Sequence, residues 1–349
     1  MKNLIKIVTC ITVLTMVVLS FAGCSLVKNM DDINAREEQN KAIKAAEAQM
    51  KEIVMTVNGD IEISGGYYGW FFTNEYNNQY YMASQALQAD SSASSSATPE
   101  IDIESVKETV KKSVAETKLA YAKAIEAGLE LSKEDKSIMK QQLASVKSQL
   151  SQQGITPELY PLLLNTSEAY LEQIVEEQYL GNLYYASLMS DSYATTKHIL
   201  VKFGDSVRTK DEAIAMAKEI KSELDGGKDF DKLMEEKSQD ARDAEGNLTN
   251  KDGNTFSVLS GQSTVYTDAS MELSVGEVSD VIVDDDAKGL YIIKRYPLNL
   301  TNVVLSLMST TTDSLEGILI SSEKDTLTEG ADIKETDKIN YYTELLSKE

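Results

Sequence analysis

The segment Thr196-Lys197-His198-Ile199-Leu200-Val201-Lys202 decides the fold of the C-terminal half of the chain. Its β-branched and apolar residues favour an extended backbone. Successive side chains of a strand point to opposite faces, so His198 and Leu200 share one face while Ile199 and Val201 share the other. The segment therefore predicts a strand that carries the only histidine of the chain.

The residues after this strand alternate between helical and extended patterns. Thr209-x-x-Glu212 is a capping box that predicts the start of a helix, and Gly226-Gly227 predicts its end. The further predicted elements are, in chain order, a helix over 229–237, a strand over 256–259, a helix over 267–273 and strands over 278–283 and 290–295. The order βααβαββ predicts an α+β domain over 194–297, with helices packed on a small sheet.

The residues before this domain, 51–193, have a mainly helical pattern. An extended run that ends at Asn58-Gly59 predicts a strand followed by a turn. The aromatic stretch 67–82 has helical spacing and indicates a packed core, with a binding cleft as the alternative. The Ser-rich stretch 90–99 predicts a mobile loop. Amphipathic helices are then expected over 103–127, 132–153 and 167–189, the second with a capping arrangement of Ser132 and Asp135.

The tail over 298–349 carries apolar side chains that an isolated tail would expose to water. They are Val303, Val304, Leu307, Leu315 and Leu319. Because burial of apolar surface drives packing, we expect this tail to return to the helical lobe of 51–193. The predicted fold is therefore α+β: a mostly helical lobe formed by both ends of the chain, with the βααβαββ domain inserted between them.

The N-terminus has the features of an export signal. Lys2 and Lys6 form a positively charged start that precedes an apolar run over 7–22. The run is long enough for a signal peptide and short for a membrane-spanning helix. The run ends in Phe21-Ala22-Gly23-Cys24, which is similar to a bacterial lipobox. We expect residues 1–23 to be removed and Cys24 to receive diacylglycerol, with 24–50 as a tether on the outer face of the cell membrane. An ordinary secretory signal with a chance cysteine is the alternative.

The composition excludes several classes of function. The chain has 34 Lys+Arg and 56 Asp+Glu, a net charge of −22 that becomes −24 once Lys2 and Lys6 are removed. Such a charge repels nucleic acid and anionic lipid surfaces. Of the two cysteines, Cys10 lies in the signal and Cys24 carries lipid, so no disulfide can form. With one histidine and no free thiol, a Cys/His zinc site is excluded, and no metal site is expected.

Residues 194–297 resemble the parvulin family of peptidyl-prolyl isomerases. The similar pieces are Lys197-His198-Ile199-Leu200-Val201, Gly261-Gln262, Gly276-Glu277-Val278-Ser279 and Gly289-Leu290-Tyr291-Ile292-Ile293-Lys294. The flanks Thr56-Val57-Asn58-Gly59 and Ala331-Asp332-Ile333-Lys334 are similar to those of PrsA-type foldase lipoproteins and their SurA-like relatives. In those proteins an isomerase domain is inserted into a chaperone lobe.

The resemblance implies a site that rotates X–Pro bonds without metal or cofactor. It assigns catalytic roles to His198, Asp240 and Tyr291, and makes Tyr266 the apolar floor of a proline pocket. The other implied substrate contacts are Ser263, Phe256 and Leu200. Tyr291 departs from the family's second histidine, and Ser263 or Thr264 stands where the family has its pocket methionine, which makes the pocket more polar. The hydroxyl of Tyr291 is able to hydrogen-bond His198.

The predicted function is that of a membrane-anchored extracytoplasmic foldase, an isomerase and chaperone for exported polypeptides with X–Pro bonds. The alternative is a catalytically degenerate parvulin-like domain that acts only as a holding chaperone. A solute-binding lipoprotein would share the anchor and the size. That class has alternating βα units in two lobes, and the long helical patterns before Ala194 argue against it.

Overall fold

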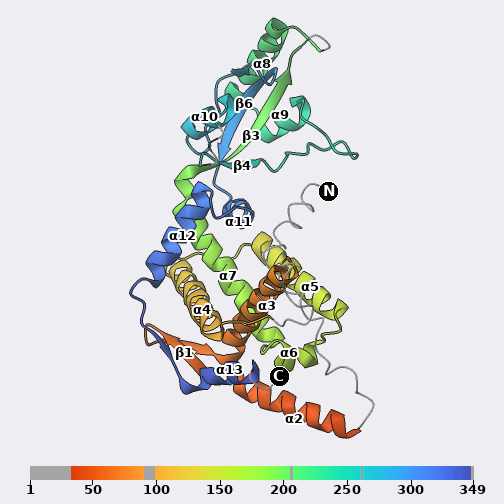
Figure 1. The fold of residues 1–349 in the computed structure, drawn as a ribbon. Helices are drawn as coiled ribbons and strands as arrows, with labels where there is room; N and C mark the ends of the chain where they lie inside the picture. The colour runs from red at the N-terminus through yellow and green to blue at the C-terminus, as the bar shows by residue number, and fades with distance from the viewer. Residues whose placement is uncertain (1–32, 90–98, 205–206, 260, 262, 347–349) are drawn as a thin grey trace. The chain divides into compact units, whose positions relative to one another are not determined.

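The computed structural model describes residues 33–89, 99–204, 207–259, 261 and 263–346 (Figure 1). The predicted signal, Cys24 and nearly all of the Ser-rich loop lie outside the described residues. The chain divides into two compact units. The first unit comprises Met1–Tyr185 and Ile320–Glu349, and the second comprises Ala186–Leu319.

The first unit is mostly helical and contains one small sheet. Its elements up to the second unit are α2 (Ile33–Gln49), β1 (Ile53–Val57), β2 (Ile61–Ser64), α3 (Gly65–Ala89), α4 (Ile103–Glu126), α5 (Lys133–Gln152), α6 (Tyr160–Leu163) and most of α7 (Glu168–Leu188). The predicted turn is confirmed, because Asn58 and Gly59 have φ angles of 55° and 81°. Asparagine and glycine tolerate this left-handed backbone, which closes the antiparallel β1–β2 hairpin.

The aromatic stretch at the start of α3 forms the core of the first unit. Tyr67, Tyr68 and Phe72 are almost fully buried, which confirms the core interpretation for this part of the helix. Farther along α3, Tyr80 and Tyr81 are exposed and belong to no core. Gly69 allows the buried half to approach the segment after α6 closely, since a Cβ atom there would lie 2.3 Å from the carbonyl oxygen of Asn165.

The predicted helix starts are confirmed by side-chain caps. The Ser132 hydroxyl accepts from the Asp135 amide and the Asp135 carboxylate accepts from the Ser132 amide, which caps α5. Thr209 and Glu212 form the same reciprocal pair at α8. Each pair satisfies backbone N–H groups that the first turn leaves without a partner.

The second unit has the predicted order βααβαββ. Its elements are β3 (Tyr193–Lys202), α8 (Lys210–Asp225), α9 (Phe230–Lys237), β4 (Asn254–Ser257), α10 (Val265–Glu272), β5 (Ile282–Asp284), β6 (Gly289–Tyr296) and α11 (Leu300–Met308), followed by the start of α12 (Leu315–Thr328). The strands form an antiparallel sheet in the order β4-β3-β6-β5, with β3 and β6 at its centre (Figure 1).

The two faces of β3 have different partners, as the alternation predicts. Ile199 and Val201 are fully buried in the domain core. The other residues of this core come from β6, from α8 and α9 and from the loop before β4: Ala213, Ala217, Ile220, Phe230, Leu233, Met234, Leu248, Leu290 and Ile292. His198 and Leu200 therefore face away from this core, on the other side of the sheet.

Two predicted strands differ in their bounds. β4 starts at Asn254, before the predicted 256, and β5 begins at Ile282 although 278 was expected. The reason lies at Ser279, whose amide donates to the carbonyl of Ile293 while its hydroxyl accepts from the Ile293 amide, each at 2.8 Å. A side-chain oxygen thus takes the place of a ladder carbonyl and interrupts the strand.

The C-terminal tail divides between the two units. Val303 and Val304 of α11 are fully buried, and α11 belongs to the second unit. Leu315 and Leu319 are 54% and 47% exposed, contrary to the expectation that they pack inward. Helix α12 turns Gly317 inward instead, because a residue without a side chain fits against the backbone of Thr311.

The end of the chain returns to the first unit, as expected. β7 (Ile333–Glu335) pairs antiparallel with β1, which becomes the central strand of the sheet β2-β1-β7. Helix α13 (Asn340–Leu346) follows and carries Tyr342, which is 1% exposed. Its ring lies 5.3 Å from that of Tyr68 and 5.9 Å from that of Phe72.

Replacement of Tyr342 tests how strongly the tail holds the helical lobe. We expect Tyr342→Ala to lower the free energy of unfolding of this lobe by about 3 kcal/mol, because a buried aromatic ring is lost and leaves a cavity. Tyr342→Phe keeps the ring contacts and serves as the control. Urea unfolding followed by the fluorescence of Trp70, the only tryptophan, measures the effect in this unit. Equal stability of the Ala and Phe variants would show that the tail does not hold the lobe.

Candidate active site

His198 lies at the centre of a polar cluster on the open face of the β3–β6 sheet. Its side chain is buried, with the residue 7% exposed. Nε2 lies 3.2 Å and 3.1 Å from the two carboxylate oxygens of Asp240, and Nδ1 lies 3.1 Å from the hydroxyl of Tyr266. Both ring nitrogens therefore have partners, so the ring orientation is fixed from both sides.

Asp240 is held beside His198 by the segment that follows α9. The Leu200 amide donates to the Ser238 hydroxyl at 3.0 Å, and the Gln239 amide donates to the Leu200 carbonyl at 2.8 Å. Ser238 in turn donates to the Asp240 carboxylate at 2.7 Å. This segment is thus attached to β3, which places Asp240 at the ring of His198.

Tyr266, which was predicted to form an apolar floor, makes polar contacts through its hydroxyl. Its ring meets that of His198 edge-on at 5.1 Å, and its hydroxyl lies 2.8 Å from that of Thr196. The ring of Phe256 on β4 lies 6.0 Å away. Helix α10, which carries Tyr266, is anchored to β6 because Arg295 donates to the carbonyls of Met271 and Leu273, which lie near the end of α10.

Tyr291 contacts His198 through its ring. In the register of β3 and β6, Tyr291 lies opposite Leu200, which places it diagonally from His198 on the same face. Its ring centroid is 5.2 Å from those of both His198 and Tyr266, in edge-on geometry. Among the described residues the hydrogen bond to Nδ1 comes from Tyr266, although the sequence suggested Tyr291 as a partner of His198.

Ser263 lies apart from this cluster. It is exposed, and its hydroxyl donates to the carboxylate of Asp268 at 2.7 Å and 2.9 Å. Its predicted neighbour in the turn, Gln262, lies outside the described residues. Leu200, 8% exposed, shares the face of His198. The substrate contacts assigned to Ser263, Phe256 and Leu200 stay predictions.

Three polar residues of the cluster escaped the sequence reasoning. They are Thr196, Ser238 and Asn250. The side-chain amide nitrogen of Asn250 lies 3.5 Å from Nε2 of His198, and the same side chain hydrogen-bonds Asp240. The alternation of the strand could have indicated Thr196, because it stands two positions before His198 and lies on the same face. For Asn250, on a loop far along the chain, no local pattern pointed to the site.

The charges of the cluster follow from these contacts. Burial alone would raise the pKa of Asp240, but hydrogen bonds from His198, Ser238 and Asn250 and the charge of His198 lower it overall. Burial raises the pKa of Tyr266 and, together with the charges of Asp284 and Asp240, that of Tyr291. Asp240 is therefore an ionised acceptor and both phenols keep their protons, an arrangement suited to binding and polarising an amide.

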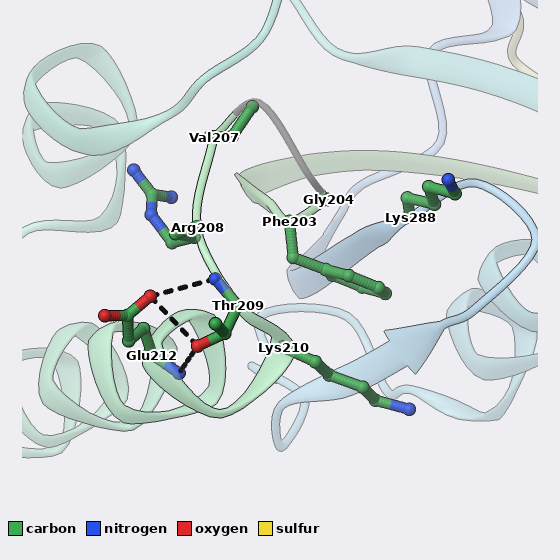
Figure 2. Close-up of a pocket in the computed structure, with 8 residues that line it drawn as sticks. All are labelled: Phe203, Gly204, Val207, Arg208, Thr209, Lys210, Glu212 and Lys288. Atoms are coloured by element: carbon green, nitrogen blue, oxygen red, sulfur yellow. Dashed lines mark hydrogen bonds between the residues drawn. The ribbon is translucent and has the colours of Figure 1, made fainter.

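A groove of about 700 Å³ lies on another part of the second unit, at the start of α8 (Figure 2). Its lining residues are Phe203, Gly204, Val207, Arg208, Thr209, Lys210, Glu212 and Lys288. The Arg208 guanidinium donates to the Gln239 side chain at 2.9 Å, so one wall touches the segment that holds Asp240. In the described part of the chain, no acid, histidine or cysteine cluster could hold a metal, and no helix is long and apolar enough to cross a membrane.

The ionised state of Asp240 predicts a specific acid sensitivity. Its folded pKa lies below the unfolded value of about 3.9, so its stabilising effect is complete above that value and disappears as the pH falls through the folded pKa. We expect the difference in unfolding free energy between wild type and Asp240→Asn to shrink as the pH falls below about 4. Unfolding followed by the NMR signal of His198, the only histidine, measures this. A constant difference down to pH 2 would contradict the assignment.

Comparison with known families and structures identifies this domain. The family described as "Rotamase: PPIC-type PPIASE domain" matches residues 198–296. Among solved structures, the chain is similar to PrsA from Bacillus subtilis, with 20% identity, a TM-score of 0.25 and coverage of 68% of this chain and 90% of that one.

Two further structures are similar at the same level. For a peptidylprolyl isomerase (PrsA) from Bacillus anthracis the identity is 19%, the TM-score 0.23 and the coverage 64% and 96%; for the foldase protein PrsA from Streptococcus pneumoniae the values are 20%, 0.23, 71% and 97%. No curated protein matches. The assignment rests on the family match over residues 198–296. Residues 198–296 belong to the PPIC-type, or parvulin, family of peptidyl-prolyl cis-trans isomerase domains.

Proposed function

We propose that this protein is a membrane-anchored foldase that isomerises X–Pro bonds in exported polypeptides and holds them while they fold. The observation that carries the proposal is the contact of His198 with Asp240 between two tyrosine rings, within a domain of the PPIC-type family. The cluster contains the residues that the sequence selected as catalytic: His198, Asp240 and Tyr291.

The reaction requires groups of this kind. Rotation about an X–Pro bond disrupts amide resonance against a barrier of about 18–20 kcal/mol, and it makes or breaks no covalent bond. A protein accelerates it by burying the proline ring against apolar surface and by hydrogen-bonding the twisted amide better than the planar one. In the proposed site the rings of Tyr266 and Tyr291 would provide the surface, and Asp240 and His198 would provide the polar groups.

The proposed anchor and location derive from the N-terminal sequence. Cys24 follows an apolar run and two small residues, as in a bacterial lipobox. Diacylglycerol on Cys24 would hold the protein at the outer face of the cell membrane, because two acyl chains bury many CH₂ groups at about 0.8 kcal/mol each. Exported chains that emerge there unfolded would be the clients.

Holding activity is supported by apolar side chains that the first unit leaves exposed. Tyr81 and Met82 near the end of α3 are 42% and 62% exposed, and Tyr80 beside them is 36% exposed. Exposed apolar groups of this kind can contact apolar segments of an unfolded chain. The net charge of −22 would favour basic clients and keep the complex soluble.

The isomerase activity can be tested with residues 25–349 and a proline-containing peptide. We expect His198→Ala to lower the rate roughly tenfold, because it removes one side of the polar pair and with it a hydrogen bond to a charged group. Tyr266→Ala should lower it most, since it removes most of the surface that buries a proline ring. Tyr291→His should raise it, because it restores the residue type that the family carries at this position.

Suppression of client aggregation, measured on the same variants, separates the two candidate activities. Unchanged suppression with altered isomerisation would show that the two functions have different sites. Isomerisation at the uncatalysed rate in the wild type and in Tyr291→His would refute catalysis and leave the holding chaperone. Circular dichroism of each variant controls for unfolding.

The anchor is tested separately in cells. Because Cys24 would be the only cysteine left after processing, Cys24→Ala should abolish incorporation of labelled fatty acid and release the protein from sedimented membranes. Ser25→Ala, next to the lipidation position, is the control and should behave as wild type. Membrane sedimentation and labelling that persist in Cys24→Ala would refute the lipoprotein assignment.

A further inference from the structure

A continuous row of hydrogen bonds crosses the candidate site. It runs from the hydroxyl of Thr196 to that of Tyr266 at 2.8 Å, from there to Nδ1 of His198 at 3.1 Å, and from Nε2 to Asp240 at 3.1 Å. The row ends at Ser238, whose hydroxyl donates to the same carboxylate oxygen, Oδ2, at 2.7 Å. Thr196 is fully buried and His198 nearly so, which shields this part of the row from water.

The acceptor at one end sets the direction of every bond in the row. An ionised carboxylate has no proton to donate, so Nε2 of His198 must carry the hydrogen that faces Asp240. In the neutral imidazole Nδ1 is then an acceptor, and the Tyr266 hydroxyl must donate to it. The phenol oxygen in turn accepts from Thr196. The Ser238 hydroxyl donates to the Asp240 carboxylate, while its own oxygen accepts from the Leu200 amide.

We propose that Thr196 and Tyr266 are positioning residues: while Asp240 holds neutral His198 as the Nε2–H tautomer, their hydroxyls hydrogen-bond in series to the acceptor Nδ1 and fix the ring from its other side. The opposite tautomer would bring the lone pair of Nε2 against a carboxylate. It would also reverse the bonds at Tyr266, whose hydroxyl would accept from Nδ1–H and donate to Thr196. Asp240 is thereby held by donors from His198, Ser238 and Asn250, which fix the orientation of its carboxylate group.

The hydroxyl of Tyr266 is the feature that requires explanation. A phenylalanine ring would provide the apolar wall of a proline pocket equally well, and a buried hydroxyl without a partner is costly. Here the hydroxyl has partners on both sides, Thr196 and His198. Burial raises the pKa of this phenol, so it keeps the proton that it donates. The catalytic consequence rests on the proposed isomerase function, whereas the tautomer does not.

The test is ¹⁵N NMR of the imidazole in residues 25–349, at a pH where the signals are those of the neutral ring. His198 is the only histidine, so both nitrogens are assigned without ambiguity. We expect a protonated Nε2 and a hydrogen-bonded, unprotonated Nδ1. Tyr266→Phe should move the Nδ1 resonance to that of a free acceptor, and isomerisation should fall roughly threefold to tenfold, as for the loss of one hydrogen bond.

Variants of the buried threonine separate positioning from packing. Thr196→Val should move the Nδ1 resonance in the same direction by less, and Thr196→Ser, which keeps the hydroxyl, should restore it. Thr195→Val is the matched control. Thr195 directly precedes Thr196 in β3 and lies on the opposite face, and its hydroxyl is 2.8 Å from that of Thr255. This variant loses a comparable hydroxyl pair and should leave the His198 signals unchanged.

A wild-type Nδ1–H tautomer, or an Nδ1 resonance unchanged in folded Tyr266→Phe, would overturn the proposal. The first outcome needs no variant, so it stands even if a substitution prevents folding. Expected NMR shifts without catalysis in the wild type would refute the isomerase function and leave the hydrogen-bond assignment intact. Catalysis without the expected NMR shifts would support the isomerase function and refute the hydrogen-bond assignment.

Discussion

The pairing of β3 with β6 is the constraint on which the second unit depends. The two strands are in antiparallel register from Thr195 and Tyr296 to Lys202 and Gly289. This register directs Ile199 and Ile292 into the core beneath α8 and α9, and His198 and Tyr291 to the opposite face. A shift of the pairing register by one residue would exchange the two faces of a strand. It would bury the imidazole among apolar side chains and disrupt both the core and the site.

The site is assembled on this sheet by segments that are themselves fastened to it. The residues after α9 hydrogen-bond β3 at Leu200, and α10 is tied to β6 by Arg295. Side chains placed by such rigid supports keep their geometry better than side chains on free loops. Tyr291 stands where the resemblance to the parvulin family implies a second histidine. Here the hydrogen bond at Nδ1 of His198 is made with Tyr266, and Tyr291 contacts His198 with its ring.

The first unit depends on contacts between the two ends of the sequence. β7 completes the sheet at β1, and Tyr342 packs on the aromatic residues of α3. The close approach at Gly69 serves the same core, since any side chain there would meet the backbone of Asn165. Inside this unit a buried ion pair joins Lys118 of α4 to Glu177 of α7 at 2.8 Å, and Lys118 also lies over the ring of Tyr67. A pair of this kind adds little net stability but penalises helix packings that would separate the charges.

The sequence by itself determined the features that depend on neighbouring residues. The caps at Ser132 and Thr209, the turn at Asn58-Gly59 and the alternation along β3 follow from hydrogen bonds and periodicity within a few residues. The likeness to a family then selected His198 and Asp240, which the fold brings together, as well as Ser263, which lies apart.

Only the tertiary structure decided which groups meet. The donor to Nδ1 of His198 lies 68 positions away and the acceptor of Nε2 lies 42 positions away, so their contact depends on how α10 and the segment after α9 pack on the sheet. The same holds for Asn250 at the site and for Leu315 and Leu319, whose apolar character predicted burial that the packing of α12 does not give them. Local sequence patterns indicate which contacts a residue is able to make. Which of the possible partners it meets depends on long-range packing, because those partners lie far away in the sequence.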